Sequence, residues 1–248
     1  MSLRTAPATP TAPEQGEQVH VLLSGIVGST AYGLAGPQSD IDRLGVIAAP
    51  TTALVGLHPP RESHVTTKPD RTLHEARKFA LLCIGGNPTA FELLWLPDDL
   101  YEVRTALGDE LIDLRSVFLS ARRVRDAYLG YASQQFRRLT ERGDGSFSAD
   151  LRKRTAKHAR HLARLTHQGV HLYTTGHLKI RVADPQWYHD FGDAVAAGDI
   201  TIARNLLAEA RQQMDEATSP LPARVDPEPV VAWLLRVRRA YWNPAAQP

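Results

Sequence analysis

One sequence feature constrains the fold of this 248-residue chain more than any other. It is a glycine-serine turn followed by two carboxylates at the start of an apolar run. A first apolar run at residues 19–23 leads to Gly28-Ser29, and Asp40-Ile41-Asp42 opens a second apolar run. Short apolar runs bounded by glycine and proline turns are typical of β-strands. We therefore expect strands at residues 19–23 and 40–48, joined by a tight connection.

The rest of the chain predicts a third strand at residues 62–67 and then mainly helices. Apolar spacing and helix start and stop signals predict helices at 72–84, 88–96, 110–118, 121–142, 149–175, from Asp184-Pro185 onward, 200–217 and 230–241. Ser148 is expected to cap the longest of these helices, and residues 177–182 to form a brief extended piece. The fold class is therefore α/β (α+β), with a sheet-containing front followed by helices.

This order of elements suggests four segments. Residues 1–18 are rich in Ala, Thr and Pro and are expected to form a disordered tail. Residues 19–115 are expected to form the catalytic domain, 116–242 a helical domain, and 243–248 a frayed end. Cys83 is the only cysteine, which excludes an intramolecular disulfide and favours a cytoplasmic protein. No apolar run approaches the roughly 20 residues of a membrane span, so no membrane partner is expected.

Charge is unevenly distributed along the chain. Residues 1–105 carry 8 Lys/Arg against 11 Asp/Glu, whereas residues 122–164 carry 12 Lys/Arg against 4 Asp/Glu. Acidic groups suit metal ions and a basic stretch suits phosphates. The charge pattern therefore favours a polyanionic partner for the middle of the chain.

Asp40 and Asp42 are the first candidates for chemistry. Residues i and i+2 of a strand point to the same face, so the two carboxylates would lie side by side and repel each other unless a cation lies between them. Mg²⁺ or Mn²⁺ suits such oxygen ligands, and two ions can hold a nucleoside triphosphate. At Gly28-Ser29 the absence of a side chain on glycine lets the backbone approach a phosphate closely, and the serine hydroxyl can add a hydrogen bond.

Together, Gly28-Ser29, Tyr32-Gly33 and Ser39-Asp40-Ile41-Asp42 resemble the signature of the DNA polymerase β superfamily of nucleotidyltransferases. The segment Asp70 to Phe79, followed by Asn87-Pro88 and Glu92-Leu93-Leu94, is similar to the bacterial and phage nucleotidyltransferases assigned to RNA repair. This resemblance implies a small mixed β-sheet flanked by helices and followed by a helical domain, with the active site in the cleft between them.

The resemblance also implies a third metal-binding carboxylate. Asp70 matches the family's aspartate, although Pro69 moves it to the end of a strand, and it would join Asp40 and Asp42 as a catalytic and metal-binding residue. Glu62 is the second candidate, and Glu75 is interpreted as part of a solvated helix face. Glu92 is interpreted as a structural residue that caps its helix or bridges to Arg77 or Lys78.

A basic helix provides the remaining candidates. Lys157, His161, Arg164 and Gln168 follow a helical spacing on one face, and the segment resembles the second domain of the same family. We expect Lys157, His161 and Arg164 to bind nucleotide together with Gly28 and Ser29. A solvated basic helix without a ligand is the alternative.

The resemblance implies transfer of a nucleoside monophosphate from a nucleoside triphosphate to a hydroxyl, with release of pyrophosphate. An RNA 3′ end, such as that of a tRNA, is the expected acceptor. A protein or small-molecule acceptor is the first alternative. An inactive nucleotide-binding regulator is the second, and the intact aspartate pair argues against it.

Overall fold

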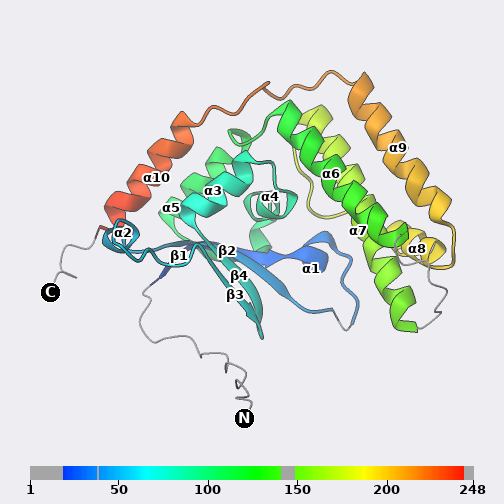
Figure 1. Cartoon of the computed structure of the whole chain (residues 1–248), viewed down its shortest axis with the longest axis horizontal. Coiled ribbons are helices and arrows are strands. Elements are labelled where there is room, and N and C mark those ends of the chain that lie inside the picture. The colour runs from blue at the N-terminus through cyan, green and yellow to red at the C-terminus, as the bar shows by residue number, and fades with distance from the viewer. Residues whose placement is uncertain (1–18, 38, 141–148, 243–248) are drawn as a thin grey trace, which may run out of the picture.

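The computed structural model describes residues 19–37, 39–140 and 149–242 of the chain (Figure 1). The predicted tail at 1–18, the Ser148 cap and the predicted frayed end at 243–248 lie outside these residues. The strands are β1 (His20–Val27), β2 (Asp42–Ala48), β3 (Ser63–Thr67), β4 (Asp70–Glu75) and β5 (Tyr101–Arg104). They form one sheet in the order β3-β4-β2-β1-β5.

The helices follow the predicted order along the chain. They are α1 (Gly28–Tyr32), α2 (Thr51–Leu54), α3 (Ala76–Ile84), α4 (Pro88–Leu94), α5 (Ala106–Asp113), α6 (Ala121–Thr140), α7 (Ala149–Thr175), α8 (Pro185–Ala196), α9 (Ile200–Glu216) and α10 (Glu228–Ala240), with 3₁₀ turns at Asp98–Leu100 and Leu114–Ser116. The mixed sheet followed by helices confirms the predicted α/β class.

The directions of the strands determine which strand ends lie together at one edge of the sheet. The central strand β2 is antiparallel to β1, with Val27 opposite Asp42, and parallel to β4, with Arg43 opposite Arg71. The end of β1 and the starts of β2 and β4 therefore lie at the same edge. Since α1 follows β1 directly, Gly28 also lies there.

Several of the expected elements differ in the structure. The helix expected at 110–118 is formed as α5 (Ala106–Asp113) followed by a 3₁₀ turn, and the short helices α1 and α2 had no counterpart among the predicted helices. The helix expected from residue 72 begins only at Ala76, because residues 70–75 pair with β2 as strand β4. Their alternating buried side chains, Leu73 and Glu75, fit the pleat of a strand. Strand β2 begins at Asp42, so Asp40 lies just before it and the same-face argument does not apply to it directly. Strand β5 had no counterpart among the predictions, and residues 177–182 form no strand.

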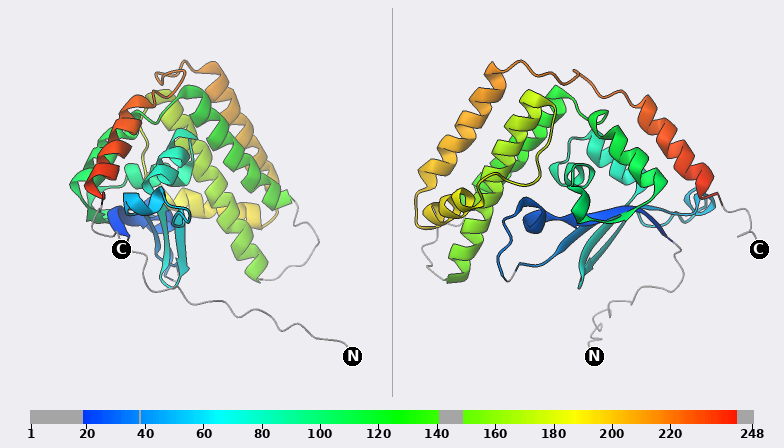
Figure 2. Two further views of the ribbon diagram at one scale, coloured as in Figure 1. Left: turned by 60° about the vertical axis from the view of Figure 1, so that its left-hand side comes forward. Right: turned by 180° about the vertical axis from the view of Figure 1, so that it is seen from behind.

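Helices cover the sheet on one side and form a second group beside it (Figures 1 and 2). Helices α3, α4 and α5 lie over the sheet, whereas α6 to α9 pack together next to α1. The buried apolar side chains of both groups belong to one continuous core. Among the described residues, no helix has the length and apolar character needed to cross a membrane.

The last helix, α10, returns to the sheet side of the molecule, apart from α6 to α9 (Figure 1). The buried Trp233 donates its indole N–H to the Leu107 carbonyl oxygen at 2.9 Å. Arg238 donates to Glu75 Oε1 at 2.6 Å, and Glu75 is only 3% exposed. Glu75 also caps α3 by accepting the Arg77 backbone N–H. The interpretation of Glu75 as a solvated helix residue is therefore wrong.

The Glu75–Arg238 pair should contribute measurably to stability. We expect Arg238→Gln to lower the free energy of unfolding by about 2 kcal/mol, because it leaves a buried carboxylate without its charged partner. Arg239→Gln is the matched control, since Arg239 is exposed and forms no ion pair with a described residue. Urea unfolding of both variants tests this, and equal midpoints would contradict it.

Candidate active site

The two central strands bring two of the predicted carboxylates together. Asp42 begins β2 and Asp70 begins β4, and these parallel strands run in register from Arg43 and Arg71 onward. Asp40 precedes β2 by two residues and is exposed. All three carboxylates therefore lie at the edge of the sheet where β1 runs into α1.

Gly28 lies directly against one of these carboxylates. Its φ of +69° belongs to the left-handed region, which favours glycine. A Cβ atom at this position would lie 2.3 Å from Asp42 Oδ2, so the Asp42 carboxylate would have to move to admit a side chain. The backbone conformation therefore favours glycine, and any larger residue would displace the Asp42 carboxylate.

The electrostatics of Asp42 reflect this crowding. Burial raises the pKa of the Asp42 carboxyl, the Asp70 and Asp40 carboxylates raise it further, and the Lys157 ammonium opposes them. Carboxylates that disfavour one another's ionisation are stabilised by a cation between them. The sheet edge is thus an acidic site faced by a single lysine from α7.

The donor chemistry of this edge fits a hard divalent cation. Asp40, Asp42 and Asp70 supply only carboxylate oxygens, the ligand type that Mg²⁺ and Mn²⁺ prefer. Within the described ranges, no three His, Cys, Asp or Glu side chains lie close enough together, as they stand, to enclose a metal ion. Asp40 and Asp70 are exposed, and the charges of both act on Asp42.

The other carboxylate candidates are engaged elsewhere. Glu62 is exposed and pairs with Arg77 at 3.5 Å and with Lys78 at 3.9 Å. Glu75 caps α3 and binds Arg238. Asp70 is therefore the third carboxylate whose charge acts on Asp42.

Helix α7 presents basic side chains opposite the acidic edge. Lys157 is exposed and its charge acts on Asp42. Arg138 of α6 lies near enough to act on His161, as Lys157 and Arg164 do. Lys157 of α7 therefore faces the carboxylates of the sheet, whereas Arg138 of α6 lies near His161.

Arg164 was expected to contact nucleotide, but the structure buries it. Its side chain is 1% exposed, and its guanidinium lies 4.1 Å from the centre of the Tyr32 ring. It donates to Gln168 Oε1 at 2.5 Å and pairs with Glu92 Oε1 at 3.3 Å. With these partners and no solvent access, Arg164 acts through its neighbours rather than on a bound phosphate.

Glu92 connects Arg164 to the glycine turn. It is 2% exposed, and its Oε2 accepts the backbone N–H of Gly28 at 3.4 Å, while the Tyr32 hydroxyl donates to the same carboxylate. Burial raises the pKa of Glu92, and the Arg164 charge opposes this. The predicted bridge from Glu92 to Arg77 or Lys78 is thus wrong, because its partner comes from α7.

His161 is held as a neutral hydrogen-bond partner. Its Nδ1 lies 3.0 Å from Arg164 Nη2. Because a guanidinium can only donate, Nδ1 must accept and the proton must reside on Nε2. Burial, followed by the charge of Arg164, lowers the pKa of His161 to about 3. His161 therefore offers a neutral N–H donor rather than a positive charge for phosphate.

Sequence reasoning missed the role of Glu92, although a signal was available. A glutamate within Ala-Phe-Glu-Leu-Leu has apolar residues on both sides, which is typical of a buried helix. Buried carboxylates are paired, so the pattern called for a distant cation. Arg138 offered no comparable signal, because it is one of several arginines on α6.

The buried Arg164–Glu92 pair leads to a stability prediction. Arg164→Met should lower the free energy of unfolding by about 3–5 kcal/mol, because it leaves Glu92 buried and unpaired. The double variant Glu92→Gln/Arg164→Met removes both charges and should recover most of this loss. Guanidinium unfolding of the three proteins tests the pair, and a double variant less stable than the single one would contradict it.

His161 should make stability depend on pH below neutrality. Since its folded pKa is depressed below the unfolded value, only the unfolded chain gains this proton as the pH falls from about 6.5 toward 3. Between pH 7 and pH 5, this difference should lower the free energy of unfolding by up to about 2 kcal/mol. His161→Asn keeps an acceptor for Arg164 and should remove this loss from urea unfolding curves. Exposed His58→Asn is the control, and an unchanged pH dependence in His161→Asn would refute the assignment.

Comparison with known proteins agrees with this geometry. No curated protein matches the chain. The family described as "RNA repair pathway DNA polymerase beta family", RlaP, matches residues 11–226, which include every strand and all helices except α10. The chain therefore belongs to the RNA repair pathway DNA polymerase beta family, and this membership implies a nucleotidyltransferase in RNA repair.

Proposed function

We propose that the protein transfers a nucleoside monophosphate from a nucleoside triphosphate to the 3′-hydroxyl of an RNA, with release of pyrophosphate. The observation that carries this proposal is the meeting of Asp40, Asp42 and Asp70 at one sheet edge beside the Gly28 turn. Family membership supports the reaction class.

Gly28 and Ser29 would hold the triphosphate at the start of α1. The Gly28 N–H is already bonded to Glu92, so the phosphate contacts fall to the Ser29 hydroxyl and the N–H groups that follow. Helix α1 has no side-chain cap, which leaves those N–H groups available. Lys157 would offset phosphate charge from the α7 side, with the neutral His161 as a hydrogen-bond donor. In this scheme Arg164 positions the turn through Glu92.

The proposed reaction makes one bond and breaks one bond. The acceptor oxygen forms a bond to the α-phosphorus, and the bond from that phosphorus to the α,β-bridging oxygen breaks, so that pyrophosphate leaves. Asp70 lies at the exposed end of the acidic edge, where it would accept the proton of the attacking hydroxyl. The chain contributes chiefly by orienting the reactants and by its fixed charges.

The three aspartates would also hold two Mg²⁺ or Mn²⁺ ions. When bound, such ions offset the charge of the triphosphate and stabilise the charge that develops at its α-phosphate. The acidic edge without a cation is disfavoured, as the raised pKa of Asp42 indicates.

RNA is the acceptor that the charges and the family support best. Lys157 of α7 acts on Asp42 at the acidic edge, and residues 122–164, which include most of α6 and the first part of α7, carry 12 Lys/Arg against 4 Asp/Glu, as a polyanion would require. A cationic small molecule would instead need an acidic pocket beyond the metal ligands. A protein acceptor is the alternative, and the labelling experiment includes it.

Incubation with each α-labelled nucleoside triphosphate and Mg²⁺ tests the proposal, with RNA, DNA and protein acceptors offered in parallel. We expect label on RNA with a free 3′-hydroxyl and none on RNA with a blocked 3′ end. Asp42→Asn should reduce labelling at least about 100-fold, because a metal-bound carboxylate supports several kcal/mol of charge stabilisation.

Asp113→Asn is the matched control, because Asp113 is exposed at the end of α5 and does not act on Asp42. Label on no acceptor with any triphosphate would exclude the proposal. Equal labelling by Asp42→Asn and the wild type would do the same. If only the protein acceptor were labelled, the acceptor would be a protein and not an RNA.

A further inference from the structure

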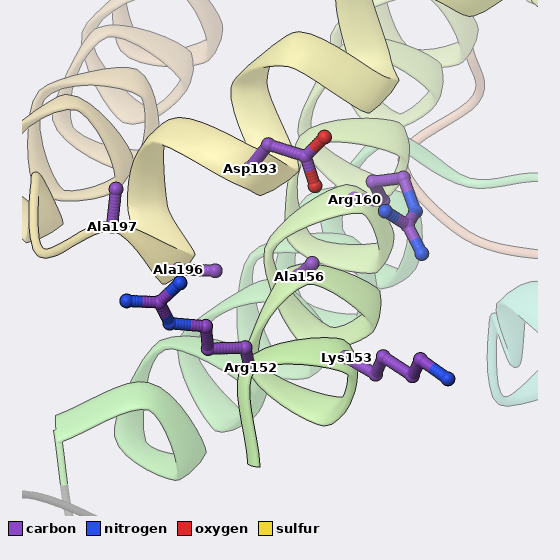
Figure 3. A pocket seen from close by; sticks show the side chains of 7 residues that line it. All are labelled: Arg152, Lys153, Ala156, Arg160, Asp193, Ala196 and Ala197. Carbon is purple, nitrogen blue, oxygen red and sulfur yellow. The ribbon is translucent and has the colours of Figure 1, made fainter. Parts of the chain in front are cut away.

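A basic hollow between α7 and α8 lies outside the site described above (Figure 3). Its volume is about 290 Å³, and three cationic side chains line it: Arg152, Lys153 and Arg160. Asp193 of α8 is the only acidic residue in the lining, and the remaining lining residues are alanines. None of these residues is among those assigned to the proposed triphosphate site, although α7 contributes side chains to both.

The cations of the hollow form no close ion pair within the described residues, although Asp193 acts on Arg160 from a longer distance. Arg152, Lys153 and Arg160 form no ion pair with any residue in the described part of the chain. Arg160 is half-buried, and this burial lowers its pKa, while Asp193 acts in the opposite direction. A partly desolvated guanidinium is stabilised by an anion, and one carboxylate does not neutralise three cations. An external anion therefore fits this hollow.

The lining also indicates which part of a nucleic acid would bind. The alanines leave the floor of the hollow open, and no aromatic side chain is present for a base to stack on. Cationic side chains without aromatic partners contact phosphates and position a strand without reading its sequence. The chemistry of the hollow is thus that of a backbone phosphate site.

Helix α7 carries both Lys157, which acts on Asp42, and the cationic side chains of the hollow. Lys153 and Arg160 stand four residues before and three residues after Lys157, so each is a neighbour of Lys157 on the helix surface. Four helical residues rise about 6 Å, so these cations lie within about one helical turn of Lys157. A strand whose 3′ end lies at Lys157 would therefore have its next phosphates close to this stretch of α7.

We propose that this hollow binds the backbone phosphates of the acceptor strand just upstream of its reactive 3′ end. The proposal rests on the proposed function, because it assumes that the acceptor is a polynucleotide. Arg152, Lys153 and Arg160 form the site, and Lys157 links it to the acidic edge. The hollow thus orients the acceptor and leaves the choice of sequence open.

Binding of a fluorescently labelled single-stranded RNA, measured by anisotropy without triphosphate, tests the proposal. We expect Arg152→Gln/Lys153→Gln to weaken binding about 10-fold and to reduce the slope of log K against log salt by roughly 1.4, at about 0.7 per phosphate contact. Arg224→Gln/Arg239→Gln also removes two exposed arginine charges that form no ion pair with a described residue, one of them on the distant α10. This control should stay within about twofold of the wild type.

Additional measurements distinguish RNA binding by the hollow from binding at the catalytic site. Asp42→Asn should retain RNA binding, so the result stands even if the wild type labels no acceptor. Triphosphate affinity should be unchanged in Arg152→Gln/Lys153→Gln. This variant should bind a DNA strand of the same sequence more weakly than the wild type does, by the same factor as for RNA. The proposal would be overturned if RNA binding weakened equally in the control, or if it did not weaken in Arg152→Gln/Lys153→Gln. It would also be overturned if this variant lost triphosphate affinity by a matching factor, or if it lost binding to RNA but not to DNA.

Discussion

The buried pair of Arg164 and Glu92 joins the two halves of this protein. Arg164 comes from the long helix α7, and Glu92 comes from α4 next to the sheet. Neither charge is accessible to water, so each depends on the other to offset the cost of burial. Glu92 uses its second oxygen to hold the Gly28 N–H. The position of the glycine turn therefore depends on the docking of α7 against the sheet side of the molecule.

This dependence explains how acidic and basic components come to face one another. The sheet supplies Asp42 and Asp70 through the parallel pairing of β2 and β4. Helix α7 supplies Lys157 two turns before Arg164, so the burial of Arg164 also directs Lys157 toward Asp42. A single buried interaction thus positions the glycine turn, the Asp42 and Asp70 carboxylates and Lys157 relative to one another. The side chains that would touch substrate stay exposed, while those that position them are buried.

Much of the candidate site was predictable because its residues are close in sequence or obey short-range rules. The glycine at position 28 and the aspartates at 40 and 42 lie within one strand-turn-strand unit, and α7 followed directly from its spacing and its Gly176 stop. Residues 72–75 of β4 were mistaken for helix, because a short apolar pattern fits both periods and only pairing with β2 decides between them. Strand β5 was missed because its four residues are mostly exposed and carry no alternation strong enough to detect.

The sequence by itself predicted the class of fold and marked the Gly28-Ser29 turn and the aspartates at 40 and 42 as candidates, because these depend on local backbone preferences and residue chemistry. Asp70 was singled out by the resemblance to a family. Tertiary structure decided which charges are free to act. The helical spacing placed Lys157, His161 and Arg164 on one face, yet only packing made Lys157 exposed, His161 neutral and Arg164 buried. Likewise, only folding brought Glu92 to Arg164 and Glu75 to Arg238. Burial and long-range pairing change the energy of a charge by more than any local preference does, and a one-dimensional pattern does not contain them.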